Sequence, residues 1–561
     1  MSRRQMKKVL GPPQIGPVHS SSEEEEPHCS YVNKKLNAYA ELEVQSSQSA
    51  LEDCETYEAT RSEDSETLEA APSDLKETNK EKKKAKKKNK LKTNKSTSAK
   101  ADDIDQLVQE VNDMLGEPSP KVETVAEKKP KQSIFSVRKM HLNVSNELNR
   151  LFGPDDADGN RKKPKQQSKD IVRNPITPLK TYPFKNMGLS MAVVTTRDDI
   201  TYFVYNHNTE YQRRHRELIA HIEQGNDPQG VPILQSFANM HVEGMLELFR
   251  LYCRAEEYSN ANSLLENLIG YLQFTAHPLF NITNLNARLE YTYVENRAFH
   301  IAILLYSYLL SNKACHRTAL ELAKMLMNLD PSDPLGVIFI IDTFAIRARE
   351  YAWLIEAIDY WEVNRDAKYL FNMKYSYALA HFHVLNNKKE DLKLADKLLK
   401  DALMLFPMGL LAILSTTTLP LTSRTEKISS HRLFTTYART IFPLRDVIKL
   451  YAAMIGSRWV EPPVLEWLLR NADELIDVFD NDPAVQIEVS AIAVWHKTLY
   501  RRWPLPVSRH LIIIYPMSDL IADGSVPLMP VYLNTHFFNP LPVASATINR
   551  YSYPARRYSL H

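Results

Sequence analysis

Glycine and cysteine are scarce in this chain, with 14 and 4 of its 561 residues. So little glycine suits helices and leaves little material for the loops that hold phosphate groups. The four cysteines form no CxxC pair, so the sequence indicates neither a disulfide framework nor a structural zinc site. We expect reduced thiols in the cytosol or nucleus at Cys29, Cys54, Cys253 and Cys315.

Long apolar runs are also missing. The longest lie around residues 337–346 and 409–414, which is far short of the roughly 20 residues that cross a bilayer. The basic amino terminus has no apolar run behind it. We therefore expect no secretory signal, no membrane helix and no membrane partner.

Catalytic motifs are absent as well. The chain has no Walker loop, dinucleotide fingerprint, HExxH or GxSxG, and no cysteine in a protease or ubiquitin-ligase context. His381 and His383 are two residues apart, so on a helix they point to different faces and do not share a metal. The sequence predicts a non-enzymatic protein without catalytic, cofactor-binding or metal-binding residues.

What the chain does contain is helical periodicity, most clearly between Phe299 and Leu329. Apolar residues recur there at helical spacing on both sides of a short turn at Asn312. Ala319 and Ala323 allow the second helix to approach the first closely, and proline stops the second helix where a tetratricopeptide-type repeat usually ends. Such hairpins bury their apolar faces by stacking on neighbours, which indicates an α-solenoid, a fold that usually serves binding.

Similar pairs precede and follow this hairpin, but their spacing is irregular. Pro278, Pro331 and Pro407 do not keep the period of about 34 residues of tetratricopeptide repeats, and an insertion separates Phe280 from Glu295. The predicted fold is therefore mostly α, a degenerate tetratricopeptide-like α-solenoid. A short strand is expected at 201–205, and Asp333 is expected to cap a helix that starts at Pro334.

Composition predicts the domain organisation. We expect a long, disordered, charge-segregated N-terminal arm over residues 1–135 and a short helix and linker over 136–187. A helical-repeat domain follows over 188–420, and further helices over 421–503. Because prolines forbid long helices, the proline-rich and aromatic C-terminal tail at 504–561 is predicted to be extended.

The near-zero net charge of +2 hides strong local segregation in the arm. An acidic head begins with SSSEEEE at residues 20–26, and lysine dominates residues 80–95. This lysine tract is a nuclear localisation signal, an RNA or ribosome contact through phosphate groups, or a solvated charge run. It offers no arginine or glutamine and only the isolated Asn89 and Asn94 to read bases, so it is a poor sequence-specific DNA element. Its predicted contact residues are Lys82, Lys83, Lys84, Lys86, Lys87, Lys88 and Lys90.

Two short amphipathic helices are predicted at 102–115 and 141–153. In the second, Asn143 or Ser145 caps the start, Gly153 caps the end, and Leu148, Leu151 and Phe152 form the apolar face. Both helices are too short to be stable alone, so each is expected to dock on the solenoid or on a partner.

A series of short segments carries a family resemblance. In order along the chain these are HLNVSNELNRLFG, NHNTEYQ, HPLF, RLEY, ENRAF, CHRTALELAK, LDPSDPL, IDTFAIRAREY, ALMLFP, SSHRLF, WVEPP, PVSRHLII and FNPLP. From about Ser136 to the end the chain resembles the transcription factor 25 family, also called nuclear localised protein 1. Its fungal members are the first subunit of the ribosome quality control complex.

The resemblance implies a non-enzymatic subunit in cytoplasm and nucleus. Such a subunit acts on stalled 60S ribosomes and helps the ubiquitin ligase listerin build degradation-signalling ubiquitin chains on the nascent polypeptide, for extraction by the valosin-containing ATPase. The alternative is a nuclear, DNA-associated transcriptional regulator. For contacts with a partner such as ubiquitin we select the exposed polar groups expected at Arg288, Arg347, Arg349, His431 and Arg432.

Overall fold

The structure is a computed structural model. It describes residues 133–153, 176, 185–224, 235–236, 241–365, 367–416, 422–435, 442–499, 504–522, 536–541 and 547–554. The chain divides into two units, residues 1–122 and 123–561, and all described residues belong to the second. The acidic head, the lysine tract and the helix predicted at 102–115 lie outside the described residues.

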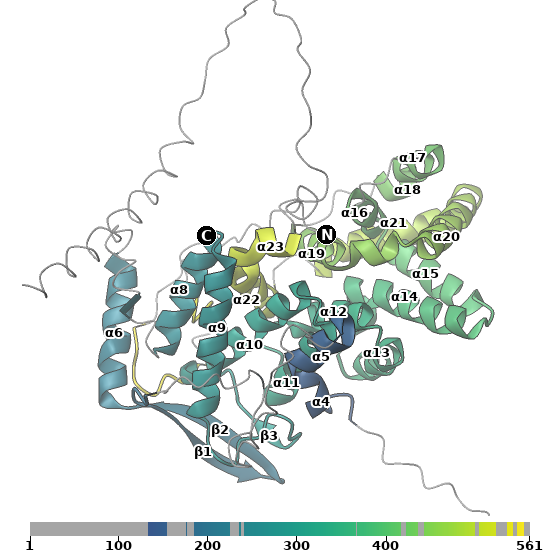
Figure 1. Cartoon of the computed structure of the whole chain (residues 1–561). Coiled ribbons are helices and arrows are strands. Elements are labelled where there is room, and N and C mark those ends of the chain that lie inside the picture. Colours follow the sequence, from purple (N-terminus) through teal and green to yellow (C-terminus); the bar gives the residue numbers. More distant parts are fainter. Residues whose placement is uncertain are drawn as a thin grey trace, which may run out of the picture. The chain divides into compact units, whose positions relative to one another are not determined.

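A small sheet begins the globular region, beside helix α6 (Thr209–Gln224) (Figure 1). Strands β1 (Leu189–Arg197) and β2 (Ile200–His207) form an antiparallel hairpin, and β3 (Ala287–Arg288) pairs with β2 in parallel. The two-residue turn is formed by Asp198 and Asp199, both at positive φ, as a tight hairpin turn requires. The predicted strand at 201–205 is therefore confirmed within β2, whereas β1 was not predicted.

The rest is mostly helical, which confirms the predicted fold class at that level. The hairpin predicted around residue 312 is confirmed as α10 (Val294–Asn312) packed on α11 (His316–Leu329), with Ala319 and Ala323 buried in α11. Other neighbouring helices that pack as pairs are α8 (Val242–Arg254) with α9 (Tyr258–Phe274), and α14 (Phe371–Lys388) with α15 (Lys393–Leu405). The repeat character of these pairs stays a prediction.

The remaining helices complete one hydrophobic core that runs through the described residues. Their bounds are α4 (Lys139–Leu142), α5 (Val144–Phe152), α12 (Ile341–Ala348), α13 (Tyr351–Arg365), α16 (Met408–Ser415), α17 (Ser423–Ser430), α18 (Arg432–Thr435), α19 (Phe442–Trp459), α20 (Pro462–Asn481), α21 (Pro483–Leu499), α22 (Leu505–Ile514) and α23 (Ser518–Ala522). Three short 3₁₀ helices are η1 (Val337–Phe339), η2 (Ala367–Tyr369) and η3 (Tyr515–Met517).

One helix start differs from the sequence prediction. Asp333 does accept backbone hydrogen bonds, from the N–H groups of Val337 and Ile338, but the segment it caps is η1. The α-helix begins at Ile341 rather than Pro334, because Gly336 adopts a left-handed conformation with φ 63° that no helix accommodates. The predicted start at Pro334 is wrong.

The extended tail predicted after residue 504 is also wrong for residues 505–522, which form α22, η3 and α23. Pro504 and Pro506 lie at the start of α22, where a missing N–H costs no intrahelical hydrogen bond. The helix is held by its polar side chains: the Arg509 guanidinium donates to the carbonyl oxygens of Pro334 and Leu541, and His510 contacts Leu335 O at 2.8 Å.

No single helix among the described residues is long and apolar enough to cross a membrane. One bent pair, α15 with α16, reaches the length and composition only when both helices are counted together, and a bend of 100° separates them.

A buried carboxylate joins α12, α14 and α19. Asp342 accepts hydrogen bonds from Asn372 Nδ2 at 2.8 Å and from Ser376 Oγ at 2.6 Å. Ser376 Oγ in turn lies 3.1 Å from Tyr451 Oη on α19. Burial raises the pKa of Asp342 to about 6, although both hydrogen bonds oppose the shift.

This raised pKa predicts a pH dependence of stability. The folded state holds the Asp342 proton more tightly than the unfolded chain does, so stability falls as pH rises from about 4 through about 6. The loss is on the order of 3 kcal/mol, from about two pKa units at 1.36 kcal/mol each. In urea unfolding, the free energy of unfolding of Asp342→Asn relative to that of the wild type should therefore increase by that amount between pH 4 and pH 7.

The matched control is Asp401→Asn, at an exposed carboxylate on α15. Its difference from the wild type should stay constant over the same pH range. An Asp342→Asn difference that is equally constant would show that this carboxylate titrates alike in the folded and unfolded chains.

Candidate functional site

Two of the predicted partner-binding arginines are engaged inside the fold. Arg288 Nη1 donates to the carbonyl oxygens of Leu285 and Ala287 and to Asn328 Oδ1. Arg347 Nη1 donates to Ser311 Oγ at 3.1 Å, and burial lowers its pKa to about 10. Both guanidinium groups join elements of the core, so they have little capacity left for a partner.

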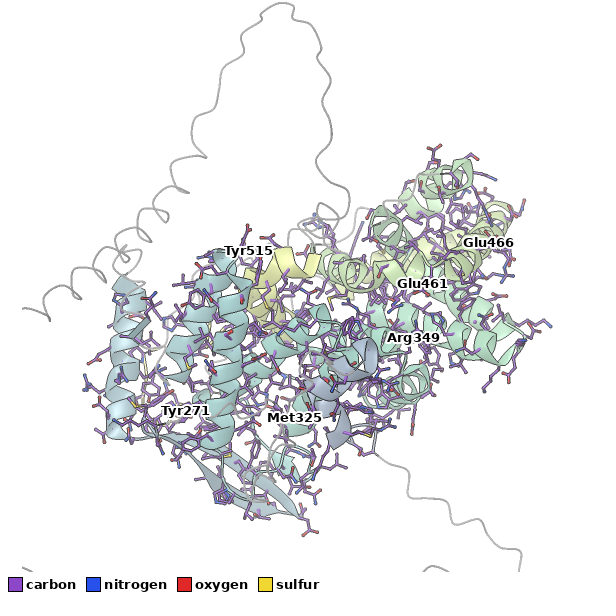
Figure 2. The ribbon with its side chains drawn as sticks, viewed as in Figure 1. Tyr271, Met325, Arg349, Glu461, Glu466 and Tyr515 are labelled. Carbon is purple, nitrogen blue, oxygen red and sulfur yellow. The ribbon has the colours of Figure 1, made fainter. Side chains whose placement is uncertain are left out.

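Arg349 is placed differently (Figure 2). It is exposed, and it ends α12 in a left-handed conformation with φ 61°. Its backbone N–H satisfies the last turn of α12 by donating to Ile346 O. The backbone of Arg349 is thereby fixed at the end of the helix, while its side chain lies in solvent.

His431 and Arg432 contact an acidic side of α20. His431 Nε2 lies 3.3 Å from Asp480 Oδ2, and Arg432 Nη2 lies 3.4 Å from Asp480 Oδ1. Arg432 also lies over the Phe479 ring, at 4.9 Å from its centroid. Such exposed pairs contribute little stability, so Arg432, which remains exposed, is available to a negatively charged partner.

Further ion pairs join α20 to neighbouring helices. Arg424 on α17 pairs with Glu466 and Asp473, and Lys400 on α15 pairs with Glu474. These pairs tie α15 and α17 to α20, and Arg432 extends the row. Arg349 and Arg432 are thus the two predicted residues whose charge is the more accessible, and the structure does not bring them together through any contact among the described residues.

The short helix predicted at 141–153 docks on α11. It is α5, and Asn143 caps it by accepting from Ser145 N while Gly153 ends it at φ 83°, as predicted. Its predicted apolar face is confirmed at Leu148, which packs half-buried against the core, and is wrong at Leu151 and Phe152, which are 42% and 76% exposed. The buried side chain is Glu147, at 5% exposure.

Glu147 is buried because it caps another helix. Its carboxylate oxygens accept from Arg317 N and Thr318 N, both at 2.9 Å, and from Thr318 Oγ1 at 2.9 Å. These N–H groups lie in the first turn of α11, where they lack intrahelical acceptors and favour negative charge. A carboxylate from a distant segment supplies what the N-cap, Cys315, does not.

Further polar contacts hold the segment that precedes α5. Arg138 N donates to Glu321 Oε2 at 2.9 Å, and Trp353 Nε1 donates to Ile134 O at 3.0 Å. Lys324 Nζ bonds the other oxygen of Glu321 at 2.9 Å and lies over the Trp353 ring. Residues 133–153 therefore form a strap across α11 and α13.

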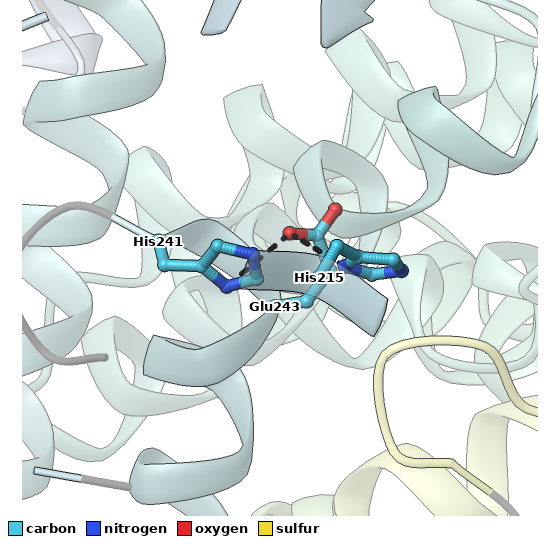
Figure 3. Close-up of side chains that lie close together, drawn as sticks. All are labelled: His215, His241 and Glu243. Atoms are coloured by element: carbon cyan, nitrogen blue, oxygen red, sulfur yellow. Dashed lines mark ion pairs between the residues drawn. The ribbon is translucent and has the colours of Figure 1, made fainter. Parts of the chain in front are cut away.

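A buried cluster of ionisable groups was missed by the sequence prediction. His207 at the end of β2, His215 on α6, and His241 and Glu243 at the start of α8 are each no more than 5% exposed. The carboxylate of Glu243 lies between the rings of His215 and His241 (Figure 3), with Oε2 3.6 Å from His215 Nδ1 and 3.8 Å from His241 Nδ1. His207 Nε2 lies 4.0 Å from Glu243 Oε1.

Burial sets the protonation states in this cluster. It lowers the pKa of His207 and of His241 to about 3, against the opposing charge of Glu243. Both rings are therefore neutral at pH 7. Burial alone would raise the pKa of Glu243, but its interactions with the surrounding histidines, His215 first, hold it below its usual range.

One feature of the sequence could have indicated this cluster. His241 and Glu243 are two residues apart at a helix start, and His207 and His215 flank the start of the preceding helix. The four residues do not form a known spacing motif, because three separate elements supply them. By contrast, His381 and His383 each pack on a different ring, Tyr377 and Tyr351, in agreement with the expectation that they face apart.

Comparison with known proteins places these elements in a family. Residues 203–523 match the family model Tcf25, described as transcriptional repressor TCF25. The chain is similar to the Mus musculus protein named ribosome quality control complex subunit TCF25, with 29% identity over 481 residues, 83% of this chain and 68% of that protein. The Homo sapiens protein of the same name is 30% identical over 471 residues, 81% of this chain and 67% of that protein.

A more distant relative of the same name, from Dictyostelium discoideum, is 26% identical over 479 residues, 73% of this chain and 64% of that protein. No solved structure gives a significant match.

Proposed function

Since residues 203–523 match the family model, this chain belongs to the Tcf25 family, and from that premise we propose that it is a subunit of a ribosome quality control complex. The observation that carries the proposal is similarity, over about four fifths of the chain, to two proteins named as such subunits. The role is non-enzymatic: the protein binds and positions other components.

The finer proposal concerns partners. The protein acts on stalled 60S ribosomes beside a listerin-type ubiquitin ligase, favours one ubiquitin linkage on the nascent chain, and works upstream of the valosin-containing ATPase. It works in the cytoplasm and also enters the nucleus. The chemistry that supports this is a set of accessible cations, Arg349 and Arg432, on a rigid helical body.

Packed helix pairs suit this task. Pairs such as α8 with α9 and α10 with α11 are the units from which a tetratricopeptide-like solenoid is built, and such a solenoid offers a long surface for several partners. A ligase domain and an acceptor ubiquitin held on one rigid body keep one relative orientation. Orientation, rather than chemistry, is then the contribution of this subunit.

The lysine tract supplies the first test. Replacing the lysines of residues 82–95 by glutamine should weaken sedimentation with 60S particles, and the difference from the wild type should shrink as salt rises, because the wild type makes more of the phosphate contacts that release counterions. Nuclear entry should fall too. Replacing the same lysines by arginine keeps the charge and should preserve both properties. Unchanged sedimentation of the glutamine variant across the salt series would reject the ribosome contact.

The alternative function is transcriptional regulation, which the description of the family model favours. The composition of the lysine tract argues against a transcriptional role, because residues 80–95 contain no arginine or glutamine to read bases. Affinity purification of the tagged chain after translation stalling separates the two. Recovery of 60S proteins with a ubiquitin ligase supports the proposal, whereas chromatin regulators without 60S proteins would replace it by the alternative.

A further inference from the structure

The distances within the histidine cluster are unusual for a cluster held by hydrogen bonds. Glu243 lies 3.6 to 4.0 Å from nitrogen atoms of His207, His215 and His241, which is longer than the roughly 3.2 Å limit of a good N–H···O bond. These separations are also too short for a bridging water, which would need about 5.5 Å between two partners at 2.8 Å each. The nitrogen and oxygen atoms face one another across a gap of intermediate size.

That gap has the size of a metal ion. In a tetrahedral zinc site with bonds of about 2.0 to 2.1 Å, neighbouring ligand atoms lie about 3.3 to 3.4 Å apart. His215, His241 and Glu243 each bring one ligand atom within 4.8 Å of the others. Closing the site around an ion requires these atoms to move together, by a few tenths of an ångström at the Glu243 contacts of His215 and His241.

Two nitrogen atoms in the cluster have no hydrogen-bond partner among the described residues. They are His207 Nε2 and His215 Nδ1, both buried. A buried ring nitrogen without a partner costs free energy. In the tautomer whose lone pair is on the nitrogen facing Glu243, such an atom can bind a cation that lies between the ring and the carboxylate.

The surroundings of the cluster resemble the outer shell that orients metal ligands. Tyr211 Oη donates to Glu243 Oε2 at 2.6 Å and itself accepts from Val242 N at 3.0 Å. His207 Nδ1 contacts Tyr553 Oη at 2.8 Å, which fixes the ring so that Nε2 faces Glu243. Such partners set the tautomer and orientation of metal-ligating side chains.

Charge also favours a cation. Glu295, on the first turn of α10, is a second buried carboxylate whose pKa is raised by burial and, to a smaller degree, by Glu243. Arg550 is the cation that acts on both Glu295 and His207. Glu243 and Glu295 are both buried in this region, where negative charge is costly unless a cation accompanies it.

We propose that His215, His241 and Glu243 bind a zinc ion, and that His207, whose Nε2 lies 4.0 Å from Glu243 Oε1, moves in as the fourth ligand. The donor set of imidazoles and one carboxylate is that of zinc rather than of magnesium or calcium, which prefer oxygen alone. Four protein ligands close the coordination sphere, so the ion is structural. It joins the end of β2, α6 and α8.

One ligand changes its contacts on binding. His241 Nδ1 accepts the Gly244 N–H at 3.1 Å as the N-cap of α8. Coordination through Nδ1 replaces this bond, and hydrogen exchange at Gly244 then becomes faster in the zinc-bound protein. The C-terminal segment 547–554 is held through the same rings, because Tyr551 stacks on His207 at 5.4 Å and Tyr553 contacts it.

The test uses the full chain with a tag that contains no histidine. After growth with added zinc, or dialysis against zinc chloride and then buffer, elemental analysis should find about one zinc ion per chain. His215→Ala and Glu243→Gln should each lower this content by about ten-fold or more. His221→Ala, on the same helix α6, should retain it.

X-ray absorption on the wild type decides the matter even where a variant fails to fold. It should show nitrogen and oxygen ligands at about 2.0 to 2.1 Å with imidazole scattering. Sulfur ligands at about 2.3 Å would place the ion on cysteine and overturn the proposal. A wild type that takes up no zinc, or equal zinc content in His215→Ala and His221→Ala, would overturn it as well.

Discussion

Glu147→Ala should be among the most destabilising single substitutions in the strap, lowering the free energy of unfolding by about 2 to 4 kcal/mol. The substitution removes a buried acceptor and leaves Arg317 N and Thr318 N unsatisfied at the start of α11. It also removes the negative charge that this helix end favours. Urea unfolding measures the loss.

Hydrogen exchange should show where in the chain Glu147→Ala is destabilised. The amides of Arg317 and Thr318 should exchange faster in Glu147→Ala, and residues 133–153 should become sensitive to trypsin at Arg138 and Arg150. Glu488→Ala, at an exposed carboxylate on α21, is the matched control and should stay within about 0.5 kcal/mol of the wild type. Equal stability of the two variants, with unchanged exchange at the start of α11, would mean that the strap does not cap this helix.

Local patterns predicted the centre of the fold well. The hairpin of α10 and α11 follows from helical periodicity, small residues at the contact and a proline just beyond the last turn, and all of these act within neighbouring residues. The second helix ends at Leu329 as predicted. Gly153 was predicted as the C-cap of α5, and Asn143 as one of two candidates for its N-cap, for the same reason, because capping depends on the residues next to the helix end.

Predictions failed where the deciding partner is distant in sequence. Glu147 is buried because of the first turn of α11, some 170 residues away, whereas apolar Phe152 is exposed. An amphipathic helical pattern alone predicts a buried Phe152 and an exposed Glu147. Similarly, the prolines at 504 and 506 were interpreted as helix breakers, but at the first turn of α22 they start a helix whose polar groups bond to Pro334, Leu335 and Leu541.

The histidine cluster could not be predicted for a related reason. Its members come from β2, α6 and α8, so no fixed spacing marks them. Only the folded chain shows that three rings surround one carboxylate. Arg288 and Arg347 were expected to be exposed on the surface. Both instead bond to main-chain and side-chain oxygens of the core.

A second large effect is expected on the linkage of the ubiquitin chains that a ligase builds. Adding this protein to a reconstituted ligase reaction should change which ubiquitin lysine is joined more than it changes the total rate, because one fixed orientation favours one nucleophile over its competitors. No chains should form when the ligase is omitted. Arg349→Glu and Arg432→Glu reverse the accessible charges and should weaken the linkage preference, whereas Lys397→Glu, at an exposed site on α15, should preserve it.

The most direct measurement is the linkage distribution of the ubiquitin product, determined by mass spectrometry with and without this chain. A positioning subunit predicts enrichment of one linkage at nearly constant total ubiquitin transfer, and no product without the ligase. A distribution identical in the presence and absence of the protein, or chains formed without the ligase, would contradict a non-catalytic positioning role.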